Sequence, residues 1–209
     1  MKLYSTVRGQ AQAEQVVEKS RFIAYVSPAE TREEADAFIA SIRKKHKDAT
    51  HNVPAVVLGD KFQIQWASDD GEPQGTSGAP IVQFLVNEGI TNVVIVVTRY
   101  FGGIKLGTGG LVRAYTHTAK LAVAEAGICE VYEGVVIECR IDYSYLAKIQ
   151  NKAKDGRFEI ASSEYGEKVE LKLICLAEDE DNLKSELLDL TAGTICMLSS
   201  EKTLMKKLV

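Results

Sequence analysis

The chain has 209 residues, of which 45% are hydrophobic and 26% are charged, with a formal net charge of −4 at pH 7. This composition is typical of a soluble globular protein long enough for two modest domains. It lacks the ~20-residue apolar run of a membrane span and the apolar start of a secretory signal, so we expect a cytoplasmic protein with no membrane partner.

The charge distribution argues against a strongly basic nucleic-acid-binding domain. Up to Cys129 the chain carries 14 basic and 13 acidic side chains, and from Glu130 onward it carries 11 and 16. A polyanion would therefore bind only to a local patch.

The first elements in chain order predict an α/β domain. Phe22–Val26 is strand-like, and Thr31 and Glu34 have the spacing of a capping box. The helix that follows has apolar residues at helical spacing, which are Ala35, Phe38, Ile39 and Ile42. Its last turn is basic (43–47), which the helix dipole favours, so a nucleic-acid patch there is the weaker interpretation.

The rest of this domain alternates strands and helices. Two strands are predicted at 53–58 and 62–66, and Pro80 suits the first turn of a helix. The continuous apolar run at 93–98 predicts a strand buried on both faces. A helix from about Gly109 to Ala126 follows, and Gly127 ends it.

The remainder predicts a second domain with the order β-α-β-β-α-β. Its strands are expected at 131–141, 157–165, 168–176 and 194–203, and its helices at 143–154 and 178–190. This is the order of a ferredoxin-like domain. The predicted domains are 1–129 and 130–209. The four cysteines, which include no C-x-x-C pair, are expected to be small buried hydrophobic residues.

A glycine-rich loop follows the buried strand and leads into the helix. Glycine permits close backbone approach, and a helix start offers N–H groups to an anion. Arg113, His117 and Lys120 would form an outward stripe on that helix. Tyr100 could stack on a base, although packing across the loop is the favoured interpretation. The candidate phosphate-binding residues are Arg99, Tyr100, Gly102, Gly103, Lys105, Gly107, Thr108, Gly109, Gly110 and Arg113. The alternative is a tight strand-to-helix connection whose glycines serve backbone geometry only.

A second polar loop lies at 68–79, and a possible ligand site there comprises Asp69, Asp70, Glu72, Thr76 and Ser77. The carboxylates could hold Mg²⁺, but the favoured interpretation is that they order the loop. Ser77 is expected to help cap the helix at Pro80 rather than act as a nucleophile. No cofactor, metal site or catalytic residue is predicted.

Four segments of the first domain resemble the signature of the IMPACT family. They are Lys19–Phe22, Ser68–Pro73, Gly75–Gly78 and Arg99–Tyr115. The resemblance covers roughly residues 19–127, and the acidic second domain is similar to that of bacterial members. It implies a ribosomal-protein-like β/α sandwich similar to domain IV of elongation factor G, followed by a domain similar to domain V.

The same resemblance implies a role in translation. The leading hypothesis is a non-catalytic translation regulator that binds RNA, the ribosome or a translation-related protein through the glycine-rich basic loop, without DNA specificity. The alternative is a small phosphate- or nucleotide-dependent enzyme that uses loops 69–72 and 102–110.

Overall fold

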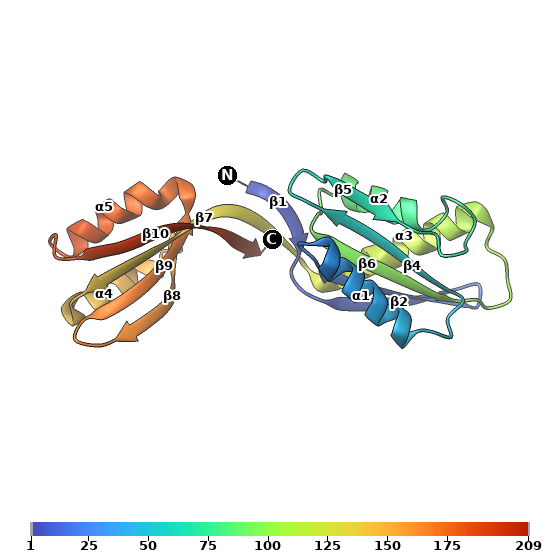
Figure 1. Cartoon of the computed structure of the whole chain (residues 1–209), viewed down its shortest axis with the longest axis horizontal. Helices are drawn as coiled ribbons and strands as arrows, with labels where there is room; N and C mark the ends of the chain where they lie inside the picture. The colour runs from blue at the N-terminus through green and yellow to red at the C-terminus, as the bar shows by residue number, and fades with distance from the viewer. Residues whose placement is uncertain (1, 209) are drawn as a thin grey trace. The chain divides into compact units, whose positions relative to one another are not determined.

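The computed structural model describes residues 2–208, which form two antiparallel sheets and five α-helices (Figure 1). They divide into two compact units. We call residues 4–130 the N-terminal unit, with which Leu208 groups, and residues 131–207 the C-terminal unit, with which Lys2 and Leu3 group. The predicted boundary lies at 129/130, and the compact units divide at 130/131.

The sheet of the N-terminal unit has the order β2-β3-β6-β4-β5, and its neighbouring strands are antiparallel. Its strands are β2 (Ala11–Val17), β3 (Ser20–Pro28), β4 (His51–Leu58), β5 (Ile64–Ala67) and β6 (Val93–Tyr100). The central strand β6 is buried from Val93 to Arg99, as its continuous apolar sequence predicts.

Helices cover both faces of this sheet (Figure 1). Side chains of α2 (Gly78–Asn87) and α3 (Gly107–Ala126) pack on one face in a core that includes Leu85 and Tyr115. Side chains of α1 (Arg32–Lys45) pack on the other face, where Ile39 and Ile42 meet Val94 and Val96. The predicted β/α layers are therefore present.

The ends of these helices refine the predictions. The Thr31 side chain accepts a hydrogen bond from the Glu34 N–H at 3.2 Å, as a capping residue does. The Glu34 carboxylate accepts from the N–H of Glu30 rather than that of Thr31, so the capping box is not reciprocal. Helix α3 begins two residues earlier than predicted and ends at Ala126, where Gly127 has a φ of 71°.

The C-terminal unit has the predicted βαββαβ order. Its elements are β7 (Ile128–Ile141), α4 (Tyr143–Ala153), β8 (Phe158–Tyr165), β9 (Val169–Leu176), α5 (Glu180–Leu190) and β10 (Cys196–Leu208). The sheet has the order β1-β7-β9-β8, where β1 is Lys2–Val7, and β10 also pairs with β7. A single 3₁₀ turn, Ala177–Asp179, precedes α5.

The cysteine prediction is confirmed for three residues and wrong for one. Cys129, Cys139 and Cys175 are buried, whereas Cys196 is exposed at the start of β10. Burial raises the pKa of Cys139 and of Cys175 to about 11, so both thiols stay protonated near neutral pH.

Across residues 2–208, no helix is both long enough and apolar enough to cross a membrane.

Candidate functional site

An open groove of about 510 Å³ lies between the β2–β3 turn, the loop after β6 and the first half of α3. From the glycine-rich loop it contains Ile104, Lys105 and Leu106. Its other lining residues are Gln15, Val17, Glu18, Gly110, Arg113, Ala114 and His117. Three of the ten predicted phosphate-binding residues, Lys105, Gly110 and Arg113, are thus brought together here.

The two cations of the groove are available to a ligand. Lys105 and Arg113 are exposed, and within residues 2–208 neither has an ion-pair partner. His117, one turn beyond Arg113, is also exposed. Glu18 is the one acidic side chain that lines the groove.

The groove wall at the β2–β3 turn is conformationally constrained. Val17 pairs with Ser20, so the turn consists of Glu18 and Lys19, with φ values of 45° and 65°. Such turns favour Asn and Gly, and other residues cost strain there. The loop after β6 lies against this turn, because a Cβ at Gly102 would stand 2.0 Å from the Lys19 carbonyl carbon.

Arg99 does not line the groove, since it is 4% exposed and lies in a buried ion pair. Its Nη1 donates to Glu72 Oε1 at 2.6 Å, and its Nη2 donates to Ser20 Oγ at 3.3 Å. The Tyr115 hydroxyl donates to the same Glu72 oxygen at 2.6 Å. Burial and this bond to the carboxylate raise the pKa of Tyr115. These contacts fix the polar loop to β6 and α3.

His51 lies at the edge of this network. Its Nδ1 is 2.8 Å from the carbonyl oxygen of Asp70, which can only accept, so Nδ1 carries the hydrogen. Its Nε2 then faces Glu72 Oε1 at 3.7 Å.

Tyr100 lies on the other face of the sheet from Arg99, because successive side chains of a strand alternate. It packs against the core beneath α1. Its hydroxyl lies 2.9 Å from His46 Nδ1 and donates to Asp48 at 3.3 Å. The structure therefore places Tyr100 outside the groove.

The remaining glycine-loop residues are divided between the loop and the start of α3. Gly103 lies in the loop, and Gly107, Thr108 and Gly109 form the exposed first turn of the helix. Leu106, in the N-cap position, supplies no side-chain cap to this turn.

The acidic loop binds protein groups. Asp69 Oδ1 accepts from the Ser77 and Gly78 N–H groups at 3.1 and 3.0 Å and from Ser77 Oγ at 2.7 Å, while its Oδ2 accepts from the Gly75 N–H at 2.7 Å. Burial alone would raise the pKa of Asp69, but these bonds together lower it. Asp69 thus caps α2, whereas the predicted cap Ser77 only occupies the N-cap position.

The other members of this loop also have partners. Asp70 accepts from the Asn52 N–H at 2.6 Å and from Arg43 at 3.2 Å, and the Thr76 hydroxyl donates to the Pro73 carbonyl at 2.6 Å. Among residues 2–208, no three His, Cys, Asp or Glu side chains lie close enough together to hold a metal ion.

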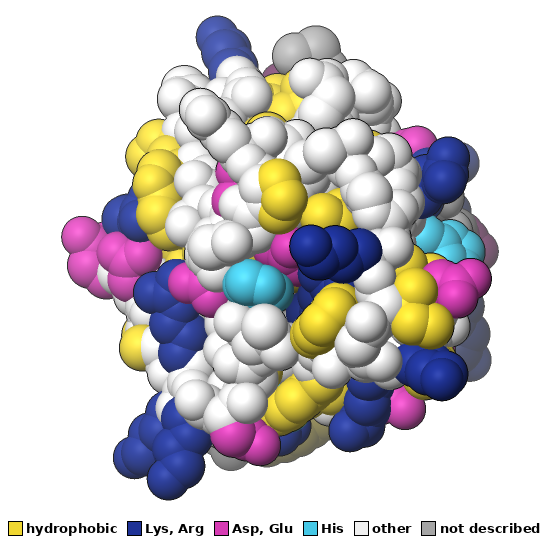
Figure 2. Space-filling model, turned by 90° about the vertical axis from the view of Figure 1, so that its right-hand side faces the viewer, with side chains coloured by type: hydrophobic (Ala, Val, Ile, Leu, Met, Phe, Trp, Pro, Cys, Tyr) yellow, Lys and Arg dark blue, Asp and Glu magenta, His cyan; other side chains and the backbone are white. Residues whose placement is uncertain are grey.

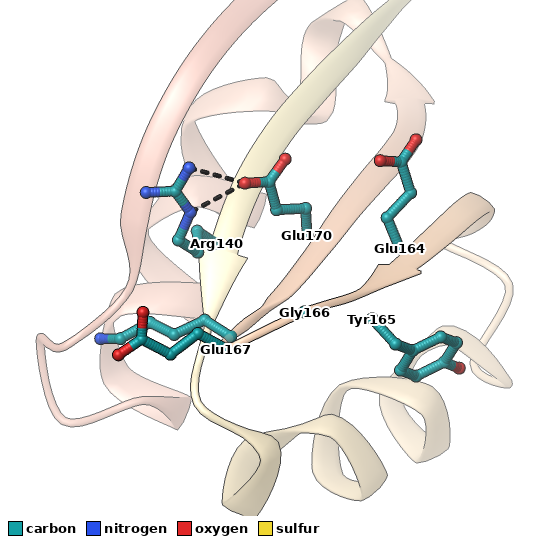
Figure 3. A pocket seen from close by; sticks show the side chains of 7 residues that line it. Arg140, Glu164, Tyr165, Gly166, Glu167 and Glu170 are labelled. Atoms are coloured by element: carbon teal, nitrogen blue, oxygen red, sulfur yellow. Dashed lines mark hydrogen bonds and ion pairs between the residues drawn. The ribbon is translucent and has the colours of Figure 1, made fainter.

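A second pocket, also of about 510 Å³, lies at the β8–β9 hairpin of the C-terminal unit (Figure 3). Its lining carries both signs of charge. Arg140 donates through Nε and Nη2 to one oxygen of Glu170, at 2.9 and 2.6 Å, and Lys168 pairs with Asp142 at 3.3 Å. The basic side chains here are therefore already neutralised, unlike those of the groove.

Sequence reasoning missed the wall of the groove at Gln15, Val17 and Glu18. The only signal for it was the resemblance around Lys19–Phe22, because pairing between segments about 90 residues apart leaves no local pattern.

Comparison with known proteins identifies the family. The chain matches the Impact N-terminal domain over residues 18–123 and a domain of unknown function (DUF1949) over residues 139–194. It is 40% identical to the IMPACT family member YvyE of Bacillus subtilis (strain 168), over 99% of this chain and 95% of that protein. It is 34% identical to the IMPACT family member YigZ of Escherichia coli (strain K12), over 89% and 92%.

A relative that matches only part of this chain and a solved structure are also similar to it. Protein IMPACT of Mus musculus is 34% identical over 94 residues, which are 43% of this chain and 29% of that protein. A crystal structure described as that of a hypothetical protein has a TM-score of 0.61 and 31% identity, and covers 95% of this chain and 98% of its own. The chain belongs to the IMPACT family and shares both domains with bacterial members over nearly its whole length.

Proposed function

We propose that the N-terminal unit binds RNA by its phosphate backbone, through the groove between the β2–β3 turn and α3. The observation that carries the proposal is that Lys105 and Arg113 line one open groove without an ion-pair partner in the described chain. An unpaired surface cation gives up no protein partner when a phosphate arrives, and its contact with the phosphate releases counterions from the RNA.

The helix start supports the same proposal. Gly109 is exposed, and a Cβ there would meet no atom within 4 Å, so packing does not require glycine. Glycine is nevertheless a poorer helix former than alanine. A bare first turn without a side-chain cap leaves room for a ligand backbone beside the N–H groups of α3.

The affinity of this surface should be modest and dependent on salt. Figure 2 shows Lys and Arg side chains scattered among acidic and hydrophobic ones rather than gathered in one basic area. The implied likeness to elongation factor G domains IV and V favours ribosomal RNA as the target. We propose a non-catalytic, translation-associated role without DNA specificity.

The test is binding of fluorescently labelled RNA across a salt series, measured by anisotropy. Lys105→Ala with Arg113→Ala should weaken binding at low salt and reduce the slope of log K against log[salt] by about 1.4, since each contact with single-stranded RNA contributes ~0.7. Co-sedimentation with ribosomes should show the same loss.

The matched control removes the same charge elsewhere. Lys44 and Lys47 are exposed at the end of α1, where the helix dipole accounts for them. Lys44→Ala with Lys47→Ala should leave the slope unchanged. If both double variants lost RNA affinity equally, binding would depend on the total positive charge and not on the groove, and the groove would be removed from the proposal.

A further inference from the structure

We propose that Phe101 stacks on an unpaired base, so that the RNA bound by the groove is single-stranded at this point. This inference rests on the proposed function and names the form of RNA that the site accepts. It starts from an exposed aromatic side chain, because Phe101 is 46% exposed at the end of the buried strand β6.

The backbone beneath this ring is held in place. The Phe101 N–H donates to Thr50 Oγ1 and the Gly102 N–H donates to Ser20 Oγ, each at 3.1 Å. The backbone at Gly102 lies so close to Lys19 that no side chain fits there. The exposure of Phe101 is therefore imposed by the fold rather than by a loose loop.

One face of the ring is occupied by a buried cation. The guanidinium carbon of Arg99 lies 5.3 Å from the centroid of Phe101 and 5.3 Å from that of the buried Phe22. Arg99 is itself held by Glu72 and Ser20, so it does not compete with a ligand. Because Phe101 is 46% exposed, part of its ring remains accessible to the flat face of a base.

The ring and the cations of the groove lie within reach of one short strand of RNA. Phe101 and Lys105 are four residues apart, so their Cα atoms are separated by at most ~14 Å. Between them, Ile104 is 37% exposed and lines the groove. A single strand can place phosphates at Lys105 and Arg113 and turn a base toward Phe101, whereas a duplex keeps its bases paired and stacked.

The experiment compares two labelled RNAs in anisotropy titrations, an unstructured strand of about 12 nucleotides and a duplex with the same number of phosphates. Phe101→Leu keeps an apolar side chain and removes the aromatic face. It should lower affinity for the single strand by about 5- to 150-fold, the range of one base stack. Duplex affinity and the salt slope should not change.

Two variants control for aromaticity and for exposure. Phe101→Trp should keep the affinity of the wild type, because it preserves a stacking surface. Tyr165 of the C-terminal unit is also an exposed aromatic residue, at 63%, and Tyr165→Leu should have no effect. Unchanged midpoints of thermal unfolding show that the variants are folded.

The outcomes separate this inference from the proposed function. If Phe101→Leu binds the single strand as tightly as the wild type, or loses equal affinity for both RNAs, stacking is overturned while groove binding stands. If the wild type binds neither RNA, the proposed function and this inference both fail.

Discussion

Glu72 links the polar loop to two other elements of the N-terminal unit. One of its oxygens accepts from both Arg99 and Tyr115, so a single carboxylate joins the polar loop, β6 and α3. Arg99 Nε has no hydrogen-bond partner in the described residues. The charge of its guanidinium is balanced by this carboxylate. A buried ion pair of this kind is weak evidence for added stability, but breaking it is costly.

We expect Glu72→Gln to lower the free energy of unfolding by about 3–5 kcal/mol, because it leaves the buried Arg99 charge uncompensated. Urea denaturation followed by circular dichroism measures this change. Glu170→Gln is the control, since the side chains of Arg140 and Glu170 are 46% and 43% exposed and such pairs contribute about 1 kcal/mol or less. Similar decreases in the free energy of unfolding of the two variants would mean that burial of the ion pair does not determine how much its loss destabilises the protein.

Arg99 and Tyr100 also show where sequence reasoning stops. Their strand is apolar at every position from Val93 to Val97, so no alternation indicates which face either residue occupies. The glycines beside them favoured an exposed loop, although the strand continues to Tyr100. Lys105 and Arg113 were predictable, because one follows the strand and the other lies on the polar stripe of an amphipathic helix.

Among the elements, α2 has an unusual start. Its cap comes from Asp69, eight to nine residues before the N–H groups that it accepts from, and not from Ser77 beside them. Local sequence rules assume a cap next to the helix, which explains why Ser77 was favoured. The helices themselves were predictable from apolar spacing. The place of Pro80 in the first turn of α2 and of Gly127 after α3 followed from the preferences of these two residue types.

We expect Asp69→Ala to destabilise the protein by about 2 kcal/mol or more, since it removes four hydrogen bonds and the charge at the helix start. Thr31→Ala removes one capping bond from α1 and should cost about 1 kcal/mol. Thermal unfolding at matched pH compares the stability of the two variants. A larger loss of stability in Thr31→Ala than in Asp69→Ala would contradict the assignment of Asp69 as the cap of α2.

The lowered pKa of Asp69 also makes its contribution to stability depend on pH. This contribution is present above the ordinary carboxyl pKa and is lost as pH falls through the lower pKa of the folded state.

At the scale of the whole molecule, the two units have separate cores. The core beneath α2 and α3 and the core beneath α1 contain no residue of the C-terminal core, which includes Ile137, Leu173 and Leu187. The βαββαβ order of the second unit was readable from alternation in its strands. The pairing of β1 with β7 was not, since it joins the start of the chain to a strand that begins only at Ile128.

Because their cores are separate, we expect the two units to unfold independently of each other. Leu173→Ala creates a cavity in the C-terminal core and should cost that unit about 2–5 kcal/mol. Hydrogen exchange should then accelerate in β7, β8 and β9 and stay unchanged in β3, β4 and β6. Leu85→Ala in the N-terminal core should give the reverse pattern. Acceleration throughout the chain in either variant would show one cooperative unit instead.

The anchoring of the loop after β6 has a consequence for the thermodynamics of any ligand that binds beside it. Ordering one backbone residue costs about 1–2 kcal/mol of conformational entropy. At Phe101 and Gly102 this entropy is already lost when the chain folds, because Thr50 and Ser20 hold both N–H groups. A ligand therefore meets a preorganised surface, and its heat capacity change on binding reflects the apolar area it covers rather than coupled folding.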